Sequence, residues 1–363
     1  MDSRPGPQGD HGGAEKSPTG GALPGVVDRI AVVVNGNAKQ VTDELVETLD
    51  QIVQSGDLFV SRSLEEAHDI ARTIVVRGYP TVLTGGGDGT FVRMVTAIVQ
   101  EAENVGRQPP RFGLLRLGTG NALAWVLGAQ SPKGRGVVAD LARLRSEGGS
   151  RELRLIEVAG LLTPFAGLGA DAIALSDYGR TKERFMRVPG VRRVATGPVV
   201  YSASMLTRTI PRYVLRPALK FAVVNEGSPA IRMGQNGRPV GASIPAGELI
   251  YEGPAQLLAF STIPYWGLGA RAFPYAEERP DRMHLRIVNF GSVEAMLNLR
   301  SIWQGVHRSD RMHDFLVDGF SLTCNPPTPL QVGGDVLGHR SQVRARLAEQ
   351  PIRVVDYYSP PPV

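Results

Sequence analysis

The first part of the chain alternates short apolar runs with longer amphipathic segments. Four apolar runs predict strands, at residues 30–34, 58–60, 81–83 and 112–115. The first run is rich in β-branched residues, as is typical of a buried strand. Three segments between them repeat apolar residues at helical spacing and predict helices: residues 43–53, 63–77 and 90–105. Strands that alternate with helices are typical of a parallel sheet covered by helices on both faces. We therefore expect a doubly wound α/β domain over residues 27–150.

The pattern changes after about residue 150, where helix-length periodic segments become scarce. Short β-type runs separated by glycine and proline follow one another: residues 153–158, 219–224, 256–262 and 284–288. This succession predicts a second, mainly antiparallel β domain over residues 151–340. Residues 1–26 contain almost nothing apolar, and we expect them to form a disordered tail.

Polar turns follow three of the predicted strands, at 35–37, 85–90 and 118–121. The carboxyl ends of parallel strands meet at one edge of a sheet, where α/β proteins bind their ligands. The turn 85–90, Gly-Gly-Gly-Asp-Gly-Thr, leads from a strand into a helix, so backbone N–H groups and a helix N-terminus converge there. Such a place favours bound phosphate, and its glycines let a ligand approach the backbone closely.

The aspartate of this turn is unexpected, because a carboxylate repels phosphate. Asp88 therefore suggests a site for a magnesium nucleotide, or a base that acts on an attacking hydroxyl group. The alternative is a glycine-rich turn with an incidental acid, since short glycine motifs are also common outside phosphate sites.

Length and composition add three expectations. A chain of 363 residues is long enough for two domains. Its single cysteine, Cys324, cannot form an intramolecular disulfide, which favours a reducing compartment. No apolar run approaches the roughly 20 residues that span a bilayer, and the N-terminus has no apolar signal core. We expect a cytoplasmic protein that also contacts membranes peripherally.

The positive charge is concentrated in one segment. Residues 178–220 hold ten basic side chains and a single acid, Glu183, although the whole chain carries a net charge of only +5. Such a segment attracts polyanions, and we expect Arg180 to Arg216 to contact an anionic membrane. A solvated charged face is the alternative. We expect no nucleic-acid partner, because no recognition motif accompanies the charge.

Taken in order, these motifs resemble those of the diacylglycerol kinase-like lipid kinases, which include sphingosine and ceramide kinases and bacterial soluble lipid kinases. The resemblance covers roughly residues 29–357. Five segments carry it: Val34-Asn-Gly-Asn37, Gly85-Gly-Gly-Asp-Gly-Thr90, Leu117-Gly-Thr-Gly-Asn121, residues 165–171 and residues 265–276.

The resemblance implies an ATP-binding α/β domain and a C-terminal β-sandwich domain for the lipid, with the site in the cleft between them. It also implies that residues 341–363 return to the first domain. The implied reaction transfers the γ-phosphate of ATP to a hydroxyl group of a diacylglycerol-like or sphingoid lipid. ATP and Mg²⁺ are the implied cofactors.

The resemblance also carries residue roles. Asp88 and Asp335 are the implied catalytic residues. Asp281 is the implied ligand of a structural Mg²⁺, and Asp88 contacts Mg²⁺ through the bound nucleotide. The implied nucleotide contacts are Asn35, Asn37, Ser61, Gly85, Gly86, Gly87, Asp88, Gly89, Thr90, Gly118, Thr119, Gly120 and Asn121.

Three segments depart from the family pattern, and in the first of them Gly36 stands where a proline is usual. Gly333-Gly334-Asp335 stands where the family has Asp-Gly-Glu, so the acid is shorter and a second acid is missing. Arg282 stands where a glycine usually follows Asp281. A catalytically inactive member of the family that binds lipid or nucleotide is therefore one alternative. A second is an NAD kinase-like phosphotransferase, to which the pair Asn225-Glu226 points. A second copy of the chain is a candidate partner.

Overall fold

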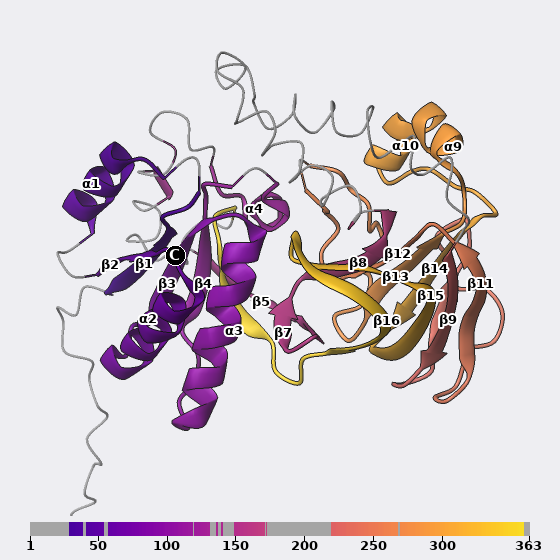
Figure 1. Cartoon of the computed structure of the whole chain (residues 1–363), viewed down its shortest axis with the longest axis horizontal. Coiled ribbons are helices and arrows are strands. Elements are labelled where there is room, and N and C mark those ends of the chain that lie inside the picture. Colours follow the sequence, from indigo (N-terminus) through magenta and orange to yellow (C-terminus); the bar gives the residue numbers. More distant parts are fainter. Residues whose placement is uncertain are drawn as a thin grey trace, which may run out of the picture.

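The computed structural model describes residues 29–358 apart from 39–40, 54–56, 119, 131–135, 137–138, 141–148, 171, 173–218 and 268. The expected tail at residues 1–26 and the basic segment from Arg180 to Arg216 lie outside the described residues. Within the described part, two sheets form the bodies of two adjacent domains (Figure 1). None of the described helices is long and apolar enough to span a membrane.

The first sheet is the predicted doubly wound core. Its strands lie in the order β2-β1-β3-β4-β17-β5, and the first four are mutually parallel. The predicted strands of this domain are confirmed as β1 (Ile30–Asn35), β2 (Leu58–Ser61), β3 (Thr81–Gly86) and β4 (Arg111–Arg116).

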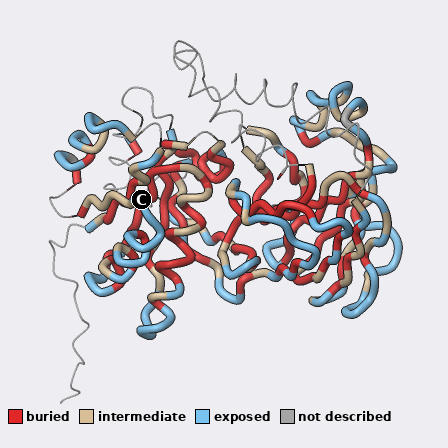
Figure 2. Tube along the Cα trace, in the orientation of Figure 1, coloured by how far each residue is buried: buried red, intermediate tan, exposed pale blue. Residues whose placement is uncertain are grey.

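Helices cover this sheet, and the residues that begin them follow the sequence signals. They are α1 (Asp43–Ile52), α2 (Leu64–Arg77), α3 (Asp88–Asn104) and α4 (Ala122–Leu127). The hydroxyl group of Ser63 accepts the N–H of Glu66 at 3.1 Å and thereby caps α2. Phe91 of α3 and Phe112 of β4 are fully buried and pack edge to face, so helix and sheet share one core (Figure 2).

The second sheet is antiparallel and has eleven strands. The strands are β6 (Ile156–Val158), β7 (Leu161–Thr163), β8 (Phe165–Gly169), β9 (Leu219–Asn225), β10 (Ile231–Met233), β11 (Leu249–Ala255), β12 (Leu257–Ser261), β13 (Met283–Val288), β14 (Met312–Val317), β15 (Gly319–Val332) and β16 (Asp335–Leu347). The irregular strand β15 pairs with β9 along its first half and with β8 along its second. Strand β15 therefore joins the part of the sheet around β9 to the part around β8, and the sheet folds over one core. In this core the rings of Phe260 and Phe320 meet edge to face.

The domains are joined at several points. The chain returns to the first sheet through β17 (Ile352–Asp356), which lies between β4 and β5 (Gly149–Leu153). Residues 341–347 still belong to β16, so the return begins later than the predicted boundary at 341. In addition, Thr96 of α3 accepts the backbone N–H of Leu162 at 2.9 Å, which fixes α3 against the second domain.

Candidate functional site

The three predicted polar turns meet at the carboxyl edge of the first sheet. Asn35, at the end of β1, donates its side-chain N–H to the hydroxyl oxygen of Thr90 at 3.1 Å. Asn37 donates to the backbone carbonyl of Arg62, just after β2, at 2.8 Å. The first turn is therefore connected to helix α3 and to the residue that follows β2. Ser61 donates to the carbonyl of Ser63 at 3.1 Å, which is a local contact at the start of α2.

The two glycine turns pack directly on each other. A Cβ atom added to Gly118 would collide with the Cα atom of Gly87, and one added to Gly86 would collide with Thr90. Only glycine permits these approaches. Helix α3 begins after Gly87 without a side-chain cap, so the N-terminal end of a 17-residue helix remains available to an anion.

Asp88 connects these turns through the backbone of α4. Its Oδ2 accepts the N–H of Ala122 at 2.9 Å, and its Oδ1 accepts the N–H of Leu123 at 3.1 Å. The side chain is buried, and this burial raises the pKa of Asp88 to about 6 even though both N–H groups oppose the rise. In this arrangement the carboxylate positions α4 against α3, a role that the sequence did not suggest. Its predicted catalytic and metal contacts remain predictions.

Asn121 completes the second turn. Its backbone is left-handed, with φ of 46°, and its side chain donates to the carbonyl of Gly118. The residue is 1% exposed, and its Oδ1 has no hydrogen-bond partner in the described structure. A buried acceptor without a donor fits a site that a ligand completes. Thr119, between these residues, lies outside the described part of the chain.

Asp335 reaches the first glycine turn from the second domain. It follows the tight turn Gly333-Gly334, in which both residues have positive φ, as expected for a two-residue hairpin loop. Both Nε and Nη2 of Arg93 lie 3.0 Å from its Oδ2. A Cβ atom added to Gly89 would lie 2.7 Å from the same oxygen. The shorter aspartate therefore does reach this turn, and its side chain stays 44% exposed.

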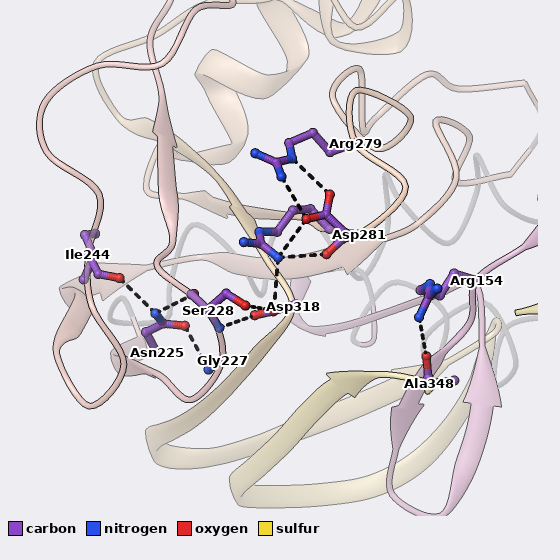
Figure 3. Close-up of polar contacts among 10 residues, drawn as sticks. Arg154, Asn225, Gly227, Ser228, Ile244, Arg279, Asp281, Asp318 and Ala348 are labelled. Carbon is purple, nitrogen blue, oxygen red and sulfur yellow. Dashed lines mark hydrogen bonds and ion pairs between the residues drawn. The ribbon is translucent and has the colours of Figure 1, made fainter. Parts of the chain in front are cut away.

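Asp281 lies away from these turns, in a surface network of the second domain (Figure 3). Its carboxylate forms two hydrogen bonds with Arg279, at 3.0 and 2.9 Å, and an ion pair with Arg282 at 3.3 Å. Two arginines already neutralise this carboxylate, so it does not fit a Mg²⁺ ion. Among the described residues no three His, Cys, Asp or Glu side chains gather as a metal site.

The pair Asn225-Glu226 also lies away from the glycine turns. Asn225 pairs with Phe320 at the beginning of β15, whereas Gly333 follows the end of that strand. The side chain of Asn225 bonds the backbone of Gly227, Ser228 and Ile244 (Figure 3), and Glu226 forms an ion pair with Arg344. Both side chains thus have structural uses, which removes the residue-level support for the NAD kinase-like alternative.

Sequence reasoning missed two parts of the site. Arg93 is the only charged residue in the apolar stretch 91–99 of α3, and this isolated charge was the one feature of the sequence that could have indicated a functional role for it. The segment 265–276 closes on the second turn, because a Cβ atom added to Gly267 would lie 3.8 Å from the Cα atom of Gly120. Beside it the rings of Trp125 and Tyr265 lie 6.3 Å apart. No sequence pattern indicates such a contact between domains.

Glycine turns suited to phosphate at the edge of a doubly wound sheet, approached by a carboxylate from a β domain, form an arrangement that is typical of phosphotransferases. Residues 29–157, about a third of the chain, match the family model of the diacylglycerol kinase catalytic domain. The first domain therefore belongs to this family, and the recognition made from the motifs is confirmed for it. No curated protein matches the sequence.

Solved structures support the same fold over most of the chain. A proposed diacylglycerol kinase from Bacillus anthracis str. Sterne aligns with a TM-score of 0.60 at 13% identity, covering 91% of this chain and 97% of the other. A structure of a diacylglycerol kinase from the same organism gives a TM-score of 0.56 at 12% identity, with the same coverages. An NAD kinase from Archaeoglobus fulgidus in complex with ATP reaches only 0.43 at 11% identity, over 91% and 94%, too weak a likeness for a conclusion. The alignments with the two Bacillus structures confirm the two-domain architecture.

Proposed function

We propose that the protein is a lipid kinase that transfers the γ-phosphate of ATP to a hydroxyl group of a diacylglycerol-like or sphingoid lipid. One observation carries this proposal. The two glycine turns of the kinase domain pack on each other, and the second domain places the half-exposed carboxylate of Asp335 beside them. Backbone donors for phosphate and an acceptor for a proton thus lie at one place, which phosphoryl transfer requires.

The turns supply the phosphate contacts in this proposal. The oxygen of Thr90 already accepts a hydrogen bond from Asn35, so its hydroxyl proton is free for a phosphate oxygen. The uncapped N-terminus of α3 favours negative charge at the same point. Thr119 would contribute from the neighbouring turn, where the buried Oδ1 of Asn121 would accept from a donor group of the nucleotide rather than from a phosphate oxygen.

Asp335 and Arg93 supply the acid-base chemistry. Arg93 binds only Oδ2 of Asp335 in the described structure, which leaves Oδ1 for the hydroxyl group of the acceptor. As the hydroxyl oxygen forms its bond to the γ-phosphorus, its proton passes to this Oδ1 and the bond to the departing diphosphate breaks. ATP would supply the transferred phosphoryl group, and Mg²⁺ bound to its phosphates would neutralise their charge.

Label transfer from γ-labelled ATP tests the proposal. The acceptors are diacylglycerol, monoacylglycerol, sphingosine, ceramide, a total lipid extract and NAD. We expect label in a lipid, and we expect Asp335→Asn to lower kcat by about 10²–10⁴-fold, the usual contribution of a general base. Asp335→Glu, which restores the residue usual in the family, should retain activity. Asp318→Asn is the matched control, because Asp318 is also paired with an arginine, Arg282, but belongs to the surface network.

Other outcomes would overturn the proposal. Label in NAD alone would make the protein an NAD kinase. ATP binding without label in any acceptor would make it an inactive member of the family. Full activity of Asp335→Asn would remove Asp335 from the chemistry.

A further inference from the structure

The connection between β13 and β14 carries an unusual group of exposed apolar side chains. It forms two short helices, α9 (Ser292–Leu297) and α10 (Leu299–Trp303), followed by a loop that leads into β14. Leu297 is 83% exposed, the highest value among the exposed large apolar residues of the described structure. We name these side chains the helical-pair surface: Val293, Met296, Leu297, Leu299, Trp303 and Val306.

The fold does not use these side chains for packing. None of the six belongs to the buried apolar clusters of the described structure. The pair is held by other contacts instead: the carbonyl of Trp303 accepts the N–H of Arg271 at 2.8 Å, and Ser309 donates to Glu294 at 3.0 Å. Exposed apolar side chains gathered on one short connection of the chain are typical of an interaction site.

The charges around the helical-pair surface favour an anionic partner. Arg300 lies between Leu299 and Trp303 and is exposed, as is Arg271 at the margin. The acid on the pair, Glu294, is already bound by Arg311, at 3.3 Å. An apolar centre with a basic margin is the pattern by which interfacial helices bind anionic lipids.

The size of the surface favours a bilayer over a protein. A stable protein interface uses about 20–30 residues on each side, whereas the helical-pair surface offers six large apolar side chains on a short connection. A few such side chains suffice for an interfacial helix, because each enters the acyl boundary independently of any matching shape.

The position of the helical-pair surface would also bring a bound membrane close to the candidate site. Helices α9 and α10 occur at the same side of the molecule as α4, which follows the second glycine turn (Figure 1). Arg271, whose N–H binds Trp303, belongs to the segment 265–276 that approaches Gly120 through Gly267. A bilayer seated on α10 would therefore touch an element that reaches the phosphate turns.

We propose that the helical-pair surface docks the protein on an anionic lipid bilayer. The choice of a bilayer rests on the proposed lipid kinase function, but docking itself does not require catalysis. The helical-pair surface shares no residue with the basic segment between Arg180 and Arg216, so the two membrane contacts can be tested with separate variants.

Sedimentation with vesicles of phosphatidylcholine and phosphatidylserine tests the docking. Leu297→Ser combined with Leu299→Ser changes no charge and no buried residue, so the fold should persist. We expect the partition constant to fall at least about tenfold, because two apolar side chains no longer enter the bilayer. Leu64→Ser with Val76→Ser is the matched control, since these residues are similarly exposed on α2, and its binding should be unchanged. Arg300→Gln should weaken binding to the mixed vesicles but not to phosphatidylcholine alone.

Several results would overturn the proposal. Equal vesicle binding by the helical-pair variant and the wild type would remove this surface from docking. A wild type that is dimeric and becomes monomeric in the variant, without vesicle binding by either, would make the surface a contact between copies of the chain. Docking and catalysis can fail separately: vesicle binding without phosphorylation of any lipid would refute only the proposed function. Phosphorylation of detergent-dispersed lipid by a variant that no longer binds vesicles would support both proposals.

Discussion

Replacing Asp88 by asparagine tests the claim that a buried carboxylate joins the two phosphate turns. Asparagine has nearly the same shape as aspartate but no proton to titrate. Its amide oxygen could accept only one of the N–H groups of Ala122 and Leu123 that Asp88 binds through two oxygens. The variant therefore changes the charge and one hydrogen bond, while the packing of α3 against α4 is conserved.

The magnitude follows from proton linkage. Burial raises the pKa of Asp88 from 3.8 to about 6, so the folded protein binds the proton more tightly than the unfolded chain. The corresponding stability is complete below about pH 4, and it is lost as the pH rises through about 6. A shift of about two units at about 1.4 kcal/mol each gives roughly 3 kcal/mol. The asparagine variant has no such dependence.

Urea denaturation of both proteins at several pH values between about 4 and 8, at constant ionic strength, measures the effect. The free energy of unfolding of the wild type, minus that of Asp88→Asn, should fall by roughly 2 kcal/mol from the acid end to the neutral end, because part of the full effect lies below pH 4. All other titrating groups cancel in this difference. A difference that stays constant across the range would refute the buried, doubly hydrogen-bonded carboxylate.

Three further changes test other parts of the structure. Gly118→Ala should destabilise the protein by about 1–3 kcal/mol through its collision with Gly87. Gly319→Ala, where an added Cβ would make only ordinary contacts at 3.6 Å or more, should be close to neutral in the same denaturation experiment. Mg²⁺ should raise the melting temperature of Asp281→Asn as much as that of the wild type, and a smaller rise in the variant would restore Asp281 as a metal ligand. Glutamine should replace four arginines of the basic segment together: Arg184, Arg187, Arg192 and Arg193. This change should weaken binding to anionic vesicles at low salt and have a smaller effect at high salt. Unchanged binding would exclude the basic segment as a membrane contact.

The local elements were predictable because their causes are local. Apolar periodicity and capping residues such as Ser63 indicate where strands and helices begin, independently of the rest of the chain. The polar turns could also be assigned to one sheet edge, since parallel strands place their carboxyl ends together. Asp335 was chosen through its place in a family motif, and whether its shorter side chain reaches the site could not be read from that motif.

The contacts between distant segments were not predictable, because they depend on how two domains meet. The isolated Arg93 gave no sign that its partner stands 242 positions later in the chain. Asp281 matched a family position, but the two arginines that neutralise it could be assigned only from their geometry.

Local pattern and backbone freedom, both readable in the amino-acid sequence, account for the alternation of strands and helices in the first domain, the β character of the second, and the glycine turns. Three features became visible only in the folded molecule: Asp88 is buried against the N-terminus of α4, Asp335 reaches Gly89, and α9 and α10 leave their apolar side chains in water. Burial and side-chain pairing depend on segments far apart in the chain, and those meet only when the sheets have formed.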